Sequence, residues 1–511
     1  MDFGLESNAI EQDIISDMKQ YFPPDTPEED ILELYRNPDK FQAYINQLET
    51  YYAEEYKNYS IYNQCIIPVL EQSFASIWVL LFLCLVLRLL CITKLPRNTI
   101  HVISFIFGCI SLWKFYEGDM VYVLVPAVIT MLLCKLVRIP GLLLTVMAGS
   151  LMLASENYFL SPIVWTKIKG SVMMISMKII SISFDEESGD PDKVIPFLEY
   201  FGYVFNPASV IFGPFITHLT YQQMFMHSNI SLNWLFNCCQ VLVTAVACLL
   251  WSSCGSSNYL ANIEDYVPGL RGNRWWKAYQ EAQQFRFSHY FSCYLSEASI
   301  LLVGIGTLTP NVKSSKENKK KKEQTIQWRS PVTSLMMVEF PRSLVDVVTN
   351  WNLPVHYWLK QYIFKSTRKY GVFAAILITY VASSMLHAFN FQLSAVLLSI
   401  GVFAYVEASF RHLLAVWFNA CIEARKCRGK CTHKYNKNNF FVMAVNLMFS
   451  MVAVWNLAYL GCLFDASEEE DKGYSMKHAL KKWQGYNYTN HLVMLVVLVF
   501  QKLSGLFVRT D

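Results

Sequence analysis

Charged side chains are scarce in this chain of 511 residues. Asp, Glu, Lys and Arg make up 16% of it, whereas 53% of its residues are hydrophobic. A typical soluble domain has about 25% charged residues, so this composition excludes an ordinary soluble protein and predicts a membrane protein. We expect the lipid bilayer to be its main surrounding, and we expect no nucleic-acid partner.

The apolar runs lack the strict alternation that a membrane β-barrel requires. Because unpaired backbone amides are costly in lipid, long runs of this kind must form helices. Residues Phe74 to Ile92 can cross a hydrocarbon core of about 30 Å, and their one charge, Arg88, lies near one end. Further runs begin near Ile100, Met120, Gly141, Ile163, Pro196, Asn233, Tyr290, Gly371, Phe391, Phe440 and His491. The sequence therefore predicts an all-α, polytopic membrane helical bundle with roughly ten to twelve spans.

No apolar signal segment precedes Phe74, so we expect no cleaved signal peptide. Residues 1–73 are acidic and contain Pro23, Pro24 and the run Glu28 to Asp30. We predict an acidic soluble head over residues 1–73 and a membrane domain over residues 74–511. A basic insertion near residues 311–328 interrupts that domain.

Basic residues gather in two loops, one with the run Lys319 to Lys322 and one from Arg425 to Lys437. Basic loops favour the cytosol, so the acidic loop Asp465 to Asp471 should lie on the other side. The apolar runs between the basic loops then form a hairpin whose turn, near Asn390, is also non-cytosolic. If every apolar run before the lysine run crossed the membrane fully, Lys319 to Lys322 would lie on the non-cytosolic side. One upstream run, with the Gly141 and Ile163 runs as candidates, should therefore be partial. Glycosylation of the sequons at Asn58, Asn229 or Asn487 would report the non-cytosolic side.

Most of the 14 cysteines lie in or beside apolar runs, where a thiol packs as a small hydrophobic group. The exception is the loop that contains Cys421, Cys427, Cys431 and His433. These groups could bind zinc, but their spacing has no Cys-x-x-Cys knuckle. We therefore expect no metal site, and favour reduced or lipid-modified thiols.

A polar, aromatic segment runs from Val338 to Leu359 and is too polar to face lipid. Pro354 disfavours the helical conformation at Leu353, which predicts a helix boundary at Trp351 and Asn352. Candidate substrate-binding residues in this segment are Arg342, Asp346, Trp351, Tyr357 and Trp358. The aromatic residues could instead form an interfacial belt, and Arg342 could pair with Asp346 at its four-residue spacing. Glu339 could also contact a ligand.

His387 lies in an otherwise apolar helix, where an ionisable side chain is a functional candidate by default. With an ordinary pKa of about 6.5, a neutral imidazole can take a proton from a hydroxyl and return it to a leaving thiolate. Ser383 and Ser384 lie on the same helix face and could orient the ring. The competing interpretation is a structural histidine that a neighbouring helix satisfies.

A tryptophan-rich Asn-Pro segment followed by a histidine on the next apolar helix resembles the membrane-bound O-acyltransferase family. In detail, the chain resembles members of that family that acylate Wnt proteins. The stretches that carry this similarity are Trp351 to Leu359, Ser384 to Ser399, Tyr405 to Glu407, Leu457 to Asp465, Phe197 to Phe205, Phe212 to Phe215 and Phe287 to Ala298. His356 departs from the pattern.

This resemblance implies an acyl tunnel within the membrane, His387 as the catalytic base and Asn352 as the second signature residue. It implies palmitoleoyl-CoA as the acyl donor, with no tightly bound cofactor, and a Wnt serine as the acceptor. It also implies the endoplasmic reticulum membrane as the location. A lipid acceptor, a transporter and a non-catalytic chaperone stay open as alternatives, although no inverted repeat typical of transporters is visible.

Overall fold

The computed structural model forms two units, Met1–Gln72 and Ser73–Asp511. It describes residues 61–93, 95–187, 194–226, 230–267, 269–310, 324–387, 391–427, 431–464 and 476–507, together with six isolated residues between 37 and 46. Several features of the sequence lie outside these residues. They are the Pro23 to Asp30 segment, Asn58, Asn229, the run Lys319 to Lys322, Asn390 and the loop Asp465 to Asp471.

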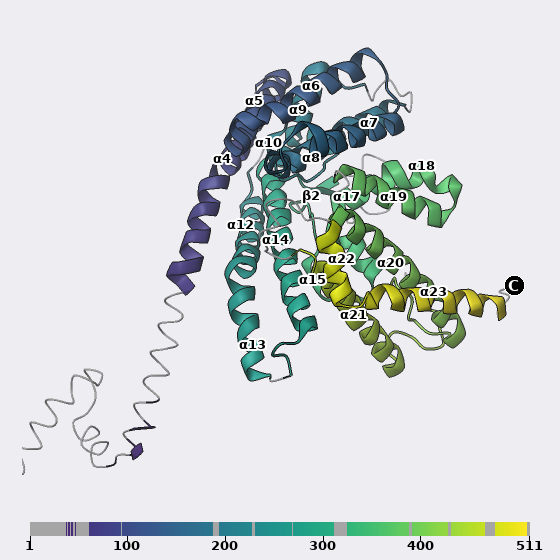
Figure 1. The fold of residues 1–511 in the computed structure, drawn as a ribbon. Coiled ribbons are helices and arrows are strands. Elements are labelled where there is room, and N and C mark those ends of the chain that lie inside the picture. The colour runs from purple at the N-terminus through teal and green to yellow at the C-terminus, as the bar shows by residue number, and fades with distance from the viewer. Residues whose placement is uncertain are drawn as a thin grey trace, which may run out of the picture. The chain divides into compact units, whose positions relative to one another are not determined.

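Nearly every described element is a helix, which confirms the predicted class (Figure 1). The first helices are α4 (Ile67–Ile92), α5 (Arg97–Tyr116), α6 (Val121–Leu136), α7 (Gly141–Ala154), α8 (Pro162–Glu187), α9 (Phe197–Val204), α10 (Pro207–Val210), α11 (His218–Tyr221), α12 (Leu232–Leu250), α13 (Ala261–Tyr266) and α14 (Arg274–Leu302). The later helices are α15 (Leu335–Glu339), α16 (Leu344–Trp351), α17 (Leu353–Trp358), α18 (Lys365–Thr367), α19 (Val372–Leu386), α20 (Phe391–Phe418), α21 (Phe440–Gly461), α22 (Met476–Gly485) and α23 (Thr489–Phe507). Wider π-helical turns occupy Tyr62–Ile66, Ser155–Phe159, Trp251–Leu260 and Leu359–Phe364, and 3-10 turns occupy Glu117–Met120, Gln222–Phe225 and Arg368–Tyr370.

The described residues contain one small exception to the helical class. Strand β1 (Thr307–Pro310) pairs antiparallel with β2 (Gln324–Gln327), so that Thr307 lies opposite Gln327 and Pro310 opposite Gln324. The two strands flank the basic stretch of the sequence. The insertion therefore leaves and re-enters the fold at neighbouring points, which allows a long insertion without displacing the helices.

Six helical stretches are long and apolar enough to cross a membrane. They are Tyr62–Ile92, Arg97–Leu136, Gly141–Phe159, Leu232–Ser256, Phe391–Phe418 and Phe440–Gly461, and Val372–Leu386 and Thr489–Ser504 are shorter apolar helices. Helices α8 and α14 are also long but are not in the set, because α8 carries too many charged residues and α14 is too polar. The number of full crossings, ten to twelve, stays a prediction.

The run beginning at Pro196, which we expected to form a span, is a broken segment. Helix α9 ends at Val204, and the side chain of Asn206 then caps the short helix α10. The fully buried Lys178 of α8 stabilises the break, because its Nζ donates to the carbonyls of Tyr203 (3.2 Å) and Val204 (2.9 Å). These are carbonyls that a helix end leaves unpaired. The break favours this segment, over the Gly141 and Ile163 runs, as the partial one.

The helices that carry the candidate residues pack against one another in the centre of the larger unit. Helix α14 contacts α12 and α21, α16 contacts α15 and α20, and α19 contacts α7 and α20. A buried ion pair fixes α14 to α15: Nε and Nη2 of Arg286 lie 2.7 and 2.9 Å from the two carboxylate oxygens of Glu339. Tyr290 donates to the same carboxylate at 2.7 Å.

Candidate active site

Asn352 is the single residue between α16 and α17, and its backbone is extended, with φ −146° and ψ 94°. Its side-chain Oδ1 accepts a hydrogen bond from the backbone N–H of Val355 at 3.1 Å, which caps α17. The predicted helix boundary is confirmed. The argument based on Pro354 placed Leu353 outside a helix. In the structure Leu353 already begins α17, and Asn352 is the residue outside both helices.

The cap determines which way the half-buried amide of Asn352 faces. Since Oδ1 is used by the helix end, the NH₂ group is the part of the side chain that remains to donate to a ligand. No described residue accepts a hydrogen bond from this group. Asn352 thus offers a donor whose orientation the fold fixes in advance.

Trp351 is held by His289 of α14, a residue that our sequence analysis did not single out. The two rings stack with centroids 4.6 Å apart and planes 11° from parallel. The His289 Nε2 also lies 3.3 Å from the backbone carbonyl of Trp351 and 3.3 Å from the Cys293 Sγ. His289 thereby anchors the residue next to Asn352. The one available signal was its place in the Phe287 to Ala298 stretch.

His387 lies at the end of α19, one residue past its last helical position, and is half-buried. Its backbone N–H donates to the carbonyls of Ser383 and Ser384 at 3.3 and 3.2 Å. The expectation that these serines orient the ring is wrong for their hydroxyls: Ser384 Oγ donates to the Tyr380 carbonyl at 2.9 Å. Among the described residues, neither hydroxyl bonds the imidazole. Both serines are buried and hold the helix end.

Helix α14 lies near both signature residues. His289 of α14 and Lys169 of α8 lie near enough to His387 to interact with it electrostatically. His289 also stacks on Trp351, the neighbour of Asn352. Residues 35 positions apart in the chain (352 to 387) thus both have the side chain of His289 in their surroundings. This arrangement brings a potential proton acceptor and a potential amide donor to the same region.

The other predicted site residues of this segment have defined partners. Arg342 donates from Nη2 to the Cys421 carbonyl at 2.9 Å and from Nε to the Glu423 carbonyl at 3.1 Å. Within the described part of the chain, it makes no direct ion pair with Asp346. Glu339 is occupied by Arg286 and Tyr290. These contacts give Arg342 and Glu339 structural functions, and substrate contact by Arg342 and Asp346 stays a prediction.

Tyr357 and Trp358 point in different directions. The Tyr357 side chain is 49% exposed at the surface, whereas Trp358 is completely buried. The Trp358 indole N–H donates to the Met177 carbonyl of α8 at 3.1 Å, so this ring fastens α17 to α8. Neither position gives a reason to place these two residues at the substrate. The half-buried His356, which departs from the family pattern, lies on the same short helix.

Comparisons with known proteins identify the family of this chain. A model of the membrane-bound O-acyltransferase family matches residues 107–454, which include His289, Asn352 and His387. The chain belongs to the membrane-bound O-acyltransferase family. A relative in Homo sapiens named protein-serine O-palmitoleoyltransferase porcupine is 34% identical over 459 residues, which cover 86% of this chain and 96% of the human protein. A relative of the same name in Anopheles gambiae is 30% identical over 499 residues, covering 91% and 96% of the two chains. Membership of the membrane-bound O-acyltransferases thus extends over most of the chain.

Proposed function

We propose that this chain is a protein-serine O-palmitoleoyltransferase that moves a palmitoleoyl group from palmitoleoyl-CoA to a serine hydroxyl of a Wnt protein. The reaction takes place in the endoplasmic reticulum membrane and supports Wnt secretion and signalling. One observation carries the proposal: His289 stacks on Trp351, next to the capped amide of Asn352, and lies near enough to His387 to interact with it electrostatically. The names of the human and mosquito relatives support the choice of donor and acceptor.

In the proposed reaction, the neutral imidazole of His387 accepts the proton of the serine hydroxyl. The hydroxyl oxygen then bonds to the thioester carbonyl carbon, and the bond from that carbon to the coenzyme A sulfur breaks. The proton passes from His387 to the leaving thiolate, so the products are an O-acyl serine and free coenzyme A. The Nδ2 donor of Asn352 stabilises the oxyanion, a contribution of roughly 3 kcal/mol in other acyl-transfer sites.

The two substrates arrive from opposite compartments in this proposal. Acyl-CoA enters from the cytosol, with its coenzyme A group near the basic loop of residues 425–437, and the secreted acceptor enters from the lumen. Direct passage of the acyl chain through a tunnel between the helices keeps a reactive, apolar group out of water. It also explains why the chemistry requires a membrane-embedded catalyst.

The first prediction concerns His387. Membranes that contain the protein are incubated with palmitoleoyl-CoA and a serine-containing Wnt peptide, and acyl transfer is measured by mass spectrometry. His387→Ala should lower the rate by roughly 10²–10⁴-fold, the usual contribution of a general base. His412→Ala is the matched control and should keep the wild-type rate, because the His412 side chain is 69% exposed and its partner is Glu423.

Retained transfer in His387→Ala would contradict the assignment of the base. Acylation of co-purified lipid, with none on the peptide, would point to a lipid acceptor. Movement of peptide or acyl-CoA across the membrane without a new ester would favour a transporter. A peptide with alanine in place of the serine shows whether that hydroxyl is the acceptor.

A further inference from the structure

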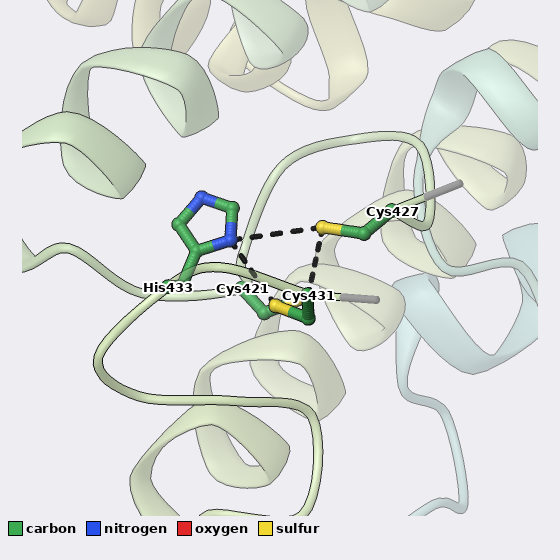
Figure 2. Close-up of side chains that lie close together, drawn as sticks. All are labelled: Cys421, Cys427, Cys431 and His433. Carbon is green, nitrogen blue, oxygen red and sulfur yellow. Dashed lines mark hydrogen bonds between the residues drawn. The ribbon is translucent and has the colours of Figure 1, made fainter. Parts of the chain in front are cut away.

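Three cysteines and a histidine converge in the loop between α20 and α21, away from His387 and Asn352. They are Cys421, Cys427, Cys431 and His433, and Figure 2 shows their side chains directed toward one another. One potential ligand atom from each lies within 4.8 Å of all the others. The Sγ atoms of Cys421 and Cys427 are 3.4 Å apart, and His433 Nδ1 lies 3.7 Å from Cys427 Sγ and 3.2 Å from Cys431 Sγ.

These separations fit a tetrahedral zinc centre. With Zn–S bonds of about 2.3 Å and Zn–N bonds of about 2.0 Å, neighbouring ligand atoms in a tetrahedron lie about 3.5–3.8 Å apart, within about 0.4 Å of the three separations given above. The three sulfurs are free thiols and not members of a disulfide. Three thiolates with one imidazole form a standard structural zinc set, and soft sulfur ligands favour zinc over magnesium or calcium.

Backbone contacts bring the ligands together without help from an ion. Ala420 and Tyr435 form an isolated parallel bridge, in which the Cys421 N–H donates to the Tyr435 carbonyl at 2.9 Å. The Tyr435 N–H donates in turn to the Asn419 carbonyl at 3.1 Å. The bridge places Cys421, the first ligand, beside the end of the loop that carries His433, the last ligand.

The half-buried Arg342 and the buried Arg411 fix the backbone around the first ligand. Arg342 Nη2 donates to the Cys421 carbonyl at 2.9 Å, and the fully buried Arg411 donates from Nε to the Ile422 carbonyl at 2.8 Å. Asn446 Nδ2 also donates to the Cys421 carbonyl, at 3.3 Å. Outer contacts of this kind orient metal ligands and are characteristic of built sites.

We propose that Cys421, Cys427, Cys431 and His433 bind one Zn²⁺ ion. Because all four positions are protein ligands, the centre is closed to substrate and its function is structural. The ion holds the two ends of the loop of residues 419–439 together. Arg342, two residues before the start of α16, binds this loop through the carbonyls of Cys421 and Glu423. Helix α16 ends at Trp351, next to Asn352, so the zinc centre supports the element that carries the amide donor.

The expectation of no metal site came from spacing alone. Five residues separate Cys421 from Cys427, three separate Cys427 from Cys431, and one separates Cys431 from His433. None of these intervals is the Cys-x-x-Cys knuckle. The Ala420–Tyr435 bridge replaces the knuckle as the device that closes the loop, and it is visible only in three dimensions.

The second prediction tests this centre in the full-length protein purified in detergent. Inductively coupled plasma mass spectrometry should find about one zinc ion per wild-type chain. X-ray absorption at the zinc edge should show three sulfur neighbours and one nitrogen neighbour. Cys427→Ser and Cys431→Ser should each lose most of the zinc, whereas Cys239→Ser, which changes an exposed free cysteine on α12, should keep it.

If the cysteine variants fail to fold, the wild-type protein still decides the question. Replacement of zinc by Co²⁺ should give the visible absorption of tetrahedral cobalt with thiolate ligands. Wild-type protein without zinc, or Cys427→Ser with a full complement of zinc, would overturn the proposal. So would a disulfide or a hydroxylamine-labile acyl group on these cysteines, because each consumes a thiolate that the ion needs.

Discussion

The amide of Asn352 has two tasks that a substitution can separate. Its carbonyl oxygen caps α17, and its NH₂ group is the donor that the proposed mechanism directs at the thioester. Alanine removes both groups, so loss of activity in an alanine variant cannot distinguish a collapsed helix end from a missing donor. Aspartate and serine keep the cap, because both are good N-cap residues.

The third prediction follows from this division. Asn352→Asp and Asn352→Ser should keep the thermal stability of the wild type and lower acyl transfer by roughly 10²–10³-fold, the cost of removing one oxyanion donor. The uncharged serine checks that the charge of aspartate is not the cause. Transfer and the unfolding temperature are measured on the same preparations.

Asn273→Asp is the matched control for this pair. Asn273 caps α14 through its side-chain oxygen and lies on the surface, outside the site. It should keep both stability and activity. Full activity in Asn352→Asp would reduce Asn352 to a helix cap and remove it from the mechanism.

Helix α14 organises the site more than any element that the sequence singled out. It supplies His289 to the Trp351 ring and Arg286 to the Glu339 carboxylate. The side chains of Arg286 and Glu339 are only 3% and 9% exposed. When one partner of such a pair is neutralised, the other charge stays buried without compensation, which costs about 3–5 kcal/mol.

The fourth prediction is therefore a loss of stability in Glu339→Gln, close to the 3–5 kcal/mol of a broken buried pair. Thermal unfolding of the detergent-solubilised protein should occur at a clearly lower temperature than in the wild type. Asp119→Asn is the comparison, because the Lys167–Asp119 pair is longer, at 3.5 Å, and its side chains are 41% and 30% exposed. A pair of that kind contributes about 0–1 kcal/mol. Equal shifts in the two variants would show that burial does not decide the contribution of these pairs.

The complete chain must present its two basic loops to one compartment and its acidic loop to the other if donor and acceptor are to meet at His387. From their charge we predict that both the lysine run and the loop of residues 425–437 lie in the cytosol. A cytosolic position also keeps the thiols of the proposed zinc centre reduced. The orientation of the chain, the entry of the acyl donor and the binding of zinc thus all depend on which loops face the cytosol.

The fifth prediction tests this orientation in cells. An epitope tag beside Lys319 to Lys322 should bind antibody after the plasma membrane alone is permeabilised. A tag in the acidic loop at Glu468 to Glu470 should require permeabilisation of the endoplasmic reticulum as well. Each tagged protein must keep acyl transfer to count as a control for correct folding. Early access to the acidic tag would reverse the proposed direction of substrate entry.

The helical membrane class, the helix boundary at Asn352 and the candidate His387 were readable from the residues, whereas the role expected for Asn352 came from the family resemblance. In lipid, the backbone amides of long apolar runs can be hydrogen-bonded only within helices. An ionisable residue in such a run is energetically costly, so it is a functional candidate. Pro354 predicted a helix boundary close by, although the boundary falls at Asn352 and Leu353 is already helical. These are short-range effects, so they need no knowledge of partners.

Only the tertiary structure determined which residues from distant parts of the chain contact one another. His289 and Arg286 lie on α14, far in the chain from the residues that they contact, and no local pattern predicts such pairs. The broken segment after Pro196 depends on Lys178 of another helix. The four ligands of the proposed zinc centre meet because Ala420 and Tyr435 pair across the loop. Contacts between distant segments arise from packing, which the order of residues along a single stretch does not contain.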